Sequence, residues 1–163
     1  MQRAPLYVYA YAMIAPSDVT DQCLALQSRM TARAVTRLYN SFLTSLGLNV
    51  TQFSLLLAIS TGKYATLAEL AEGLALEKST AVRNLQLIAK RELIVGEGKM
   101  GPGGRRYHLT SEGKDLLAEA MPRWVKAQAI MSEELGQETA SQTRKLMRTL
   151  GNAATKMASG DDR

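Results

Sequence analysis

The side chains best suited to bind another molecule lie between Lys78 and Arg106. This stretch carries seven cationic and two acidic side chains, so its net charge is +5, and the whole chain of 163 residues also has a net charge of +5. The rest of the chain is therefore neutral in sum, and the positive charge is local. Such a local surplus is typical of a surface that contacts the phosphates of a nucleic acid.

A helical repeat begins near Lys78 inside this stretch. Ala81, Leu85 and Ile88 recur on one side of it, which predicts that they face the interior. The other side carries short hydroxyl, cationic and amide groups, which can donate hydrogen bonds to phosphates and to base edges in a DNA major groove. The candidate DNA-binding side chains of this helix are Lys78, Ser79, Thr80, Val82, Arg83, Asn84, Gln86 and Lys90.

A glycine-rich segment at residues 98–104 leads directly into Arg105 and Arg106. Short apolar stretches flank it, so it predicts a β-hairpin with glycines at the tip. Lys99, Arg105 and Arg106 would then reach a minor groove or its phosphates. A nucleotide-binding loop is not indicated, because the segment lacks the Gly-Lys-Ser/Thr ending and does not open a helix.

Ser111 and Lys114 have the spacing found in serine enzymes that transfer acyl groups. Such a nucleophile needs an oxyanion hole and further motifs, and the sequence shows none. A serine at the start of a helix is explained as a helix cap. We therefore predict no enzymatic activity from this pair.

The chain has one cysteine, Cys23, and one histidine, His108. A single cysteine excludes an internal disulfide and a multi-cysteine zinc site, and it indicates a reducing compartment, which we expect to be the cytoplasm. A single histidine argues against a histidine triad or metal site, so His108 is interpreted as a structural imidazole in the second hairpin strand. The sequence predicts neither a metal nor a cofactor.

Helices are expected on both sides of the basic region. On the N-terminal side, a loop at residues 16–18 leads into one long helix over 23–46, and a buried helix follows over 52–60 with Thr51 as its N-cap. A short helix starts at 67 and breaks at 73–74. On the C-terminal side, long helices are expected over 111–134, capped by Thr110 or Ser111, and over 138–157.

These elements predict a mainly α fold with a small β-hairpin wing. The winged helix-turn-helix spans about residues 51–110, and long helices at about 22–46 and 111–158 flank it. The apolar stripes of the flanking helices are too long for one winged helix to cover. A two-fold homodimer in which these helices interlock is the expected solution.

Residues 1–21 are predicted to be an N-terminal extension, and residues 159–163 a disordered tail. Tyr7, Tyr9 and Tyr11 alternate with small apolar residues, which favours an extended segment. The extension also imitates a weak secretion signal, and a leader from an upstream start, with Met13 as the natural one, is the other interpretation. No run reaches the roughly 18 apolar residues of a membrane span, so no membrane partner is expected.

Three motifs in order resemble the MarR family of winged-helix transcriptional regulators, over roughly residues 22–150. The middle one is an acidic residue, a cation, Ser/Thr-Thr, two variable positions, an arginine and spaced leucines, seen here as Glu77, Lys78, Ser79, Thr80, Ala81, Val82, Arg83 and Leu85. LGLNVTQFSLLLAI upstream and RRYHLTSEGKDLL downstream also match. One departure stands out, because Gly103 and Gly104 precede the paired arginines where the family commonly has an aspartate that holds one of them.

The resemblance implies a homodimer that binds double-stranded DNA at a pseudo-palindromic operator, most often as a repressor. It also implies release by a small molecule, frequently an aromatic or phenolic acid. Arg29, Arg33 and Arg37 recur every four residues, either as a solvated face or as anchors for such an anion, and Tyr39 with Phe53 could form an aromatic wall. A winged-helix module that binds protein instead of DNA is the alternative from another class.

Cys23 opens the first expected helix, where a thiol becomes more reactive. Peroxide-sensing relatives carry a cysteine near this place, so a redox-sensing regulator is an alternative implied by the resemblance. Cys23 lies about two residues before the position of the cysteine in those relatives. Arg29 stands where one tyrosine partner of that cysteine would be. Tyr39 is the one such tyrosine present, and an inert buried thiol is the other interpretation.

Overall fold

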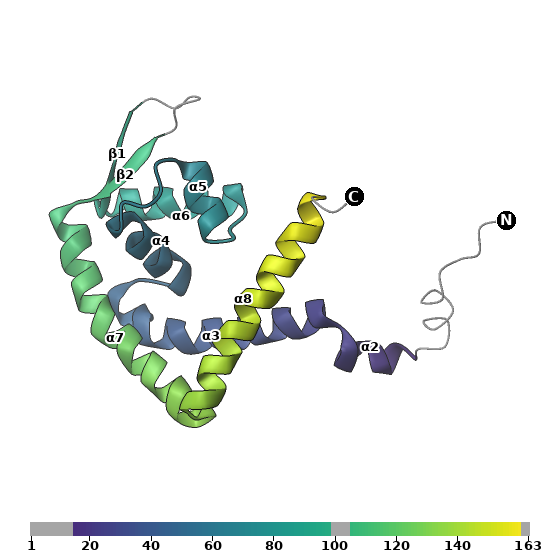
Figure 1. Ribbon diagram of the computed structural model, residues 1–163. Coiled ribbons are helices and arrows are strands. Elements are labelled where there is room, and N and C mark those ends of the chain that lie inside the picture. Colours follow the sequence, from purple (N-terminus) through teal and green to yellow (C-terminus); the bar gives the residue numbers. More distant parts are fainter. Residues whose placement is uncertain (1–14, 99–104, 161–163) are drawn as a thin grey trace.

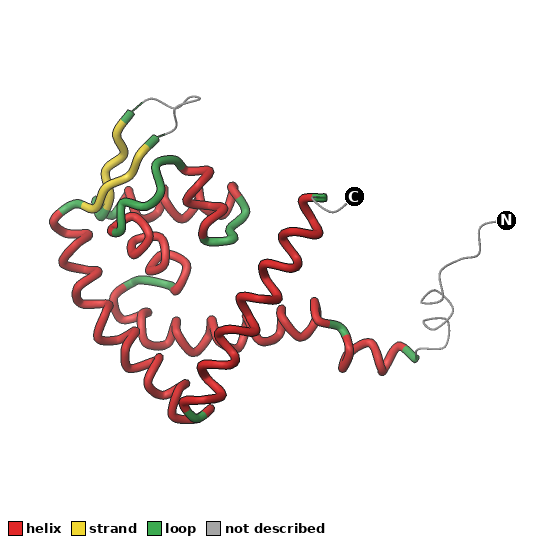
Figure 2. Tube along the Cα trace, viewed as in Figure 1, coloured by secondary structure: helices red, strands yellow, loops and turns green. Residues whose placement is uncertain are grey.

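The computed structural model describes residues 15–98 and 105–160, and helices with one two-stranded hairpin make up this part of the chain (Figures 1 and 2). This confirms the predicted fold class. The elements in order are α2 (Pro16–Gln22), α3 (Leu24–Leu43), the 3₁₀ turn η1 (Thr44–Leu46), α4 (Val50–Ser60), α5 (Leu67–Gly73), α6 (Lys78–Lys90), β1 (Ile94–Glu97), β2 (Arg106–Leu109), α7 (Ser111–Leu135) and α8 (Gln137–Ser159).

The core is built around α4, which contacts α3, α5, α6, α7 and β2. Its side chains Leu55 and Leu56 are 0% exposed, as expected for a helix that is apolar on nearly all sides. The prediction that Thr51 caps this helix is wrong. Asn49 is the cap, because its side chain accepts from the backbone N–H of Gln52 (2.8 Å) while the Gln52 side chain accepts from the backbone N–H of Asn49 (3.1 Å).

The single helix predicted over residues 23–46 is interrupted at both ends. Cys23 has an extended backbone and caps α3, and the residues before it form α2 instead of a loop. Proline suits the first turn of a helix, because the N–H that it lacks would have no partner within the helix there. This explains why α2 starts at Pro16. At the other end the helix tightens into η1 and stops at Gly47, whose φ of 65° favours glycine.

The base of the hairpin is tied to the start of α7. Thr110, one of the two predicted caps, accepts from the backbone N–H of Gly113 (3.0 Å) and donates to the carbonyl oxygen of Glu92 (2.7 Å). Ser111 is not the cap, since its hydroxyl donates to the Glu112 carboxylate (3.0 Å). Gly113 itself lies against the Leu93 carbonyl, where a Cβ would overlap the backbone oxygen. These contacts orient the hairpin on the helical body.

Helices α7 and α8 form a V whose apex is Gly136 (Figure 1). Ala140 is the one buried residue that α8 has within the described chain. Large apolar side chains further along α8 are exposed, with Leu146 at 68% and Met157 at 76%. The helix continues to Ser159, a position predicted to lie in a disordered tail; residues 161–163 of that tail are outside the described residues.

Within residues 15–98 and 105–160, no single helix is both long and apolar enough to cross a membrane, although the bent pair Leu24–Leu46 and Val50–Ser60, at 75°, meets that test by length and composition.

Candidate nucleic-acid interface

Helices α5 and α6 form the predicted helix-turn-helix. Thr66 caps α5 by accepting from the backbone N–H of Glu69 (3.1 Å). The chain then turns, with Leu76 N–H donating to the Ala71 carbonyl (2.8 Å) and Ala75 in the left-handed region at a φ of 50°. The break predicted at residues 73–74 is confirmed, and it sets α6 at an angle to α5.

The orientation of α6 agrees with its helical repeat. Ala81, Leu85 and Ile88 are 0%, 2% and 1% exposed, so this side packs into the core. Lys78, Ser79, Thr80, Arg83, Gln86 and Lys90 are exposed, whereas Val82 and Asn84 are half-buried. The amide of Asn84 donates to the Thr80 carbonyl (2.9 Å), one turn earlier in the same helix. Polar and cationic groups are thus presented outward over the whole helix.

The structure divides these outward residues into two edges. Lys78, Val82 and Gln86 line a groove between α6, α5 and the hairpin. Ser79, Arg83 and Lys90 are not among the residues that line it. The sequence pattern alone does not separate these edges, because both are outward on a helical wheel.

The hairpin pairs β1 with β2 antiparallel, with Ile94 opposite Leu109 and Glu97 opposite Arg106. Arg106 is exposed near the open end. Arg105 folds back across β1, where its guanidinium donates to the Gly96 carbonyl (3.1 Å) and lies 6.0 Å from the centroid of the Tyr107 ring. The third predicted cation of the wing, Lys99, lies outside the described residues.

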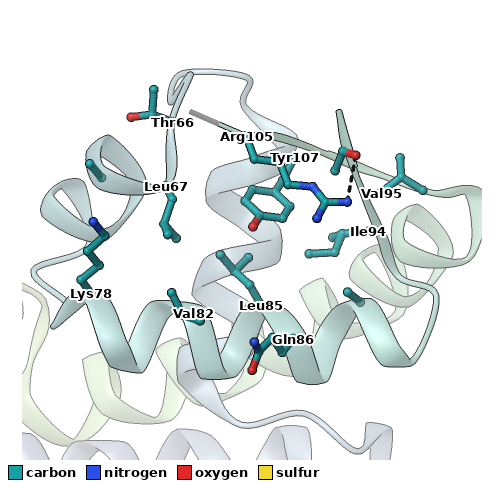
Figure 3. Close-up of a pocket in the computed structure, with 13 residues that line it drawn as sticks. Thr66, Leu67, Lys78, Val82, Leu85, Gln86, Ile94, Val95, Arg105 and Tyr107 are labelled. Atoms are coloured by element: carbon teal, nitrogen blue, oxygen red, sulfur yellow. Dashed lines mark hydrogen bonds between the residues drawn. The ribbon is translucent and has the colours of Figure 1, made fainter. Parts of the chain in front are cut away.

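The groove between α6 and the hairpin has a volume of about 700 Å³ (Figure 3). Its walls are largely apolar, including Val82, Val95 and Tyr107. Lys78 contributes a cation from α6 and Arg105 one from the hairpin, and none of the described residues that line the groove is acidic. The groove is therefore suited to an anionic molecule with apolar parts.

One cation of the basic stretch belongs to the fold. Arg91, the C-cap of α6, donates to the carbonyl oxygens of Gly47 (2.7 Å) and Leu46 (3.1 Å). These carbonyls end η1, where the chain turns toward α4. The basic surplus is therefore divided between DNA-facing candidates and at least one structural cation.

Comparison with known proteins decides the family. Residues 46–106 match a sequence profile described as the MarR family. The transcriptional regulator MosR of M. tuberculosis is 31% identical, with a TM-score of 0.74 over 83% of this chain and 98% of MosR. The chain belongs to the MarR family. The match extends beyond the profile to the flanking helices, because the MosR alignment covers most of both chains.

Two solved MarR-family structures similar to this chain contain DNA. MosR of M. tuberculosis in complex with DNA is 30% identical, with a TM-score of 0.74 and coverage of 83% of this chain and 98% of that chain. The transcriptional repressor CouR bound to a 23-mer DNA duplex shares the fold at 19% identity and a TM-score of 0.71. The match covers 85% of this chain and 99% of the CouR chain. Among curated protein sequences, none matches this chain. MarR-family regulators bind DNA, and some are repressors, so this family is one of transcriptional regulators and not of enzymes.

The residues expected to bind an effector are only partly brought together. Tyr39 and Phe53 line a smaller cleft of about 240 Å³, together with Trp124 of α7. Arg29, Arg33 and Arg37 are exposed on α3 and are not among its lining residues. The structure therefore brings Tyr39 and Phe53 together in one cleft and places the three arginines elsewhere on α3.

Tyr39 is tied to α7 at the edge of this cleft. Its hydroxyl donates to the Gln128 side-chain oxygen (2.8 Å), and the Gln128 amide donates to Ser132 (3.3 Å). Burial raises the pKa of Tyr39 above its ordinary value, and the positive charge of Arg144 on α8 partly opposes this. The hydroxyl therefore stays protonated at neutral pH and acts as a donor.

Cys23 and His108 occupy simple structural positions. The Cys23 sulfur accepts from the backbone N–H of Leu26 (3.4 Å), and the residue is half-buried, so it is more exposed than the buried thiol of the second interpretation. His108 Nε2 lies 3.4 Å from the carboxylate of Glu97 across the hairpin, and the two side chains are 46% and 73% exposed. The imidazole therefore faces a carboxylate at the surface of the hairpin.

The sequence did not identify Gly96 or Trp124 as site residues, although each lines one of the two cavities. An isolated glycine in a strand marks a close approach of another group, and Gly96 between Val95 and Glu97 carried that signal. Nothing in the sequence connects Trp124 with Tyr39, because the two residues lie far apart along the chain.

Proposed function

We propose that this chain is a homodimeric transcriptional regulator that binds double-stranded DNA at a pseudo-palindromic operator. The observation that carries this proposal is the exposed polar and cationic face of α6 beside a hairpin that bears Arg105 and Arg106, in a chain of the MarR family. The proposed contacts are Lys78, Ser79, Thr80, Val82, Arg83, Asn84, Gln86, Lys90, Lys99, Arg105 and Arg106.

A second copy of the chain is proposed to cover the exposed apolar side of α8. Burying apolar surface favours association, and Leu146, Met147 and Met157 are 68%, 49% and 76% exposed in one chain. A two-fold dimer places two recognition helices about one DNA turn, roughly 34 Å, apart. Such spacing matches the two half-sites of a pseudo-palindrome.

In vitro selection from a random duplex pool tests the function directly. We expect the selected sequences to share an inverted repeat with half-sites about 10 bp apart. Affinity for random duplex should also fall steeply with KCl concentration, because each neutralised phosphate contributes about 0.9 to the slope. A winged-helix module for protein partners would select no sequence and show no such slope.

We further propose that the regulator is a repressor released by a small aromatic acid in the cleft of Tyr39, Phe53 and Trp124. The rings supply an apolar wall, and Arg144 is the cation whose charge acts on Tyr39. A carboxylate in the cleft would accept from the Tyr39 hydroxyl by taking the place of the Gln128 side-chain oxygen. A ligand there would contact α3, α4 and α7 together, so it can favour one arrangement of the DNA-binding lobes over another.

The alternative switch is oxidation of Cys23, whose half-buried sulfur lies at the start of α3. Complexes with the selected duplex are challenged with benzoate or 4-hydroxybenzoate under reductant, and separately with peroxide, using wild type and Cys23→Ser. Release by an acid in both proteins supports the cleft. Release by peroxide in wild type alone would favour the thiol.

A further inference from the structure

The groove between α6 and the hairpin is continuous with both surfaces proposed to bind DNA. One wall is the edge of α6 that carries Lys78 and Val82, and the other is the hairpin with Val95 and Arg105. In duplex DNA, the major groove and the adjacent minor groove are separated by the sugar–phosphate backbone of one strand. A helix in the first groove and a hairpin in the second must therefore have a backbone between them.

The Arg105 guanidinium is held in this groove by the hairpin itself. Figure 3 shows the side chain beside the Tyr107 ring, with its bond to the Gly96 carbonyl (3.1 Å) marked. A Cβ at position 96 would overlap Nε of Arg105, so glycine is what allows this arrangement. A guanidinium has five N–H donors, and the bond to Gly96 uses one of them. The remaining donors are available for an anion in the groove.

We propose that Gly96 is a positioning residue for DNA binding: its carbonyl and its missing Cβ hold the Arg105 guanidinium in this groove, where Arg105 donates to a phosphate of one DNA strand. The inference rests on the proposed function and deepens it. Phosphate requires cationic donors, which Arg105 and Lys78 supply from opposite walls. The apolar C–H faces of deoxyribose match Val82, Val95 and Tyr107.

Gly96→Ala is the decisive variant, because it moves the Arg105 guanidinium without changing the charge of the protein. The overlap is with the far end of a flexible side chain, so Arg105 swings away and the fold is retained. We expect the same loss of DNA affinity from Gly96→Ala, from Arg105→Ala and from the double variant. Two residues that act through one contact give non-additive effects.

The experiment measures affinity for a labelled random-sequence 30-bp duplex at several KCl concentrations, with thermal melts of each variant. Each of the three variants should bind about tenfold to a hundredfold more weakly, as expected for loss of a hydrogen bond to a charged group. Each should also lose about one unit of salt slope. Gly151→Ala, whose added Cβ meets nothing within 4 Å, is the matched control and should bind as wild type.

Phosphate-ethylation interference on a duplex selected by wild type provides a second measurement that does not depend on Gly96. Wild type should show interference at a phosphate between a half-site and the adjoining minor groove, and Arg105→Ala should lose that signal alone. Three results would overturn the inference. They are wild-type affinity in Gly96→Ala, a loss of affinity in the double variant equal to the product of the two single losses, and an interference pattern in Arg105→Ala that is the same as in wild type. In each of these cases wild type still binds duplex, whereas failure of the proposed function would abolish binding by wild type itself.

Discussion

The guanidinium of Arg91 connects the end of α6 to the carbonyl oxygens of Gly47 (2.7 Å) and Leu46 (3.1 Å), on the turn that precedes α4. Its neighbour Lys90 is exposed at the end of the same helix and is one of the proposed DNA contacts. Two adjacent cations of one basic stretch are therefore placed differently: Arg91 is bonded to a neighbouring turn, and Lys90 is exposed.

Arg91→Ala should lower the free energy of unfolding by about 1–2 kcal/mol, because two carbonyl groups lose a charged donor at a surface position. Urea denaturation measures this change. The salt slope for random duplex should stay that of wild type, while Lys90→Ala, the matched variant, should reduce it by about one unit. A reduced slope in Arg91→Ala would show that this residue contacts phosphate after all.

Arg83→Ala should weaken binding to the selected duplex by about 1–3 kcal/mol, because Arg83 lies mid-helix on the exposed face of α6, where an arginine can bond to a guanine edge. Titration against the selected duplex and a duplex with one substituted half-site measures both affinity and specificity. Lys126→Ala on α7 removes the same charge at an exposed site away from α6 and serves as control. Equal affinities for Arg83→Ala and wild type would contradict the assignment.

Gly113→Ala should destabilise the protein by about 1–3 kcal/mol, since the added Cβ overlaps the backbone carbonyl of Leu93 and cannot be relieved by a side-chain rotation. Gly151→Ala, in open space within α8, should instead stabilise it by about 0.5–1 kcal/mol through helix propensity. Denaturation curves of both variants provide the comparison. If both substitutions changed the free energy of unfolding in the same direction, steric contact with Leu93 would not be the cause of the Gly113→Ala effect.

Leu146→Glu should convert the proposed dimer into a monomer, because it places a charge on the exposed apolar side of α8, where Leu146 is 68% exposed. Size-exclusion chromatography with light scattering should then give a mass near the 17.8 kDa of one chain. Lys145→Glu, one residue earlier on the same helix, alters charge without touching the apolar side and should stay dimeric. A dimeric Leu146→Glu protein would move the interface to another surface.

The sequence by itself determined most of the helices, the hairpin and which side of α6 is buried, although it predicted a loop where α2 lies. A helix repeats every 3.6 residues whatever its surroundings, so Ala81, Leu85 and Ile88 had to share one side, and that side had to be the apolar one. The resemblance of residues 77–85 to the MarR family was also readable in the sequence and is confirmed by the MosR comparison. Both kinds of information are local along the chain.

Contacts between distant residues were decided only by the tertiary structure. Arg91 reaches a carbonyl 44 residues earlier, Tyr39 bonds to a side chain 89 residues later, and Arg105 crosses the hairpin to a carbonyl 9 residues back. A helical or strand repeat determines only the direction of a side chain from its own backbone, and it does not say which group stands there. For that reason the sequence showed only that these cations form one local surplus of positive charge. Packing bonds Arg91 to the turn before α4 and directs Arg105 into the groove.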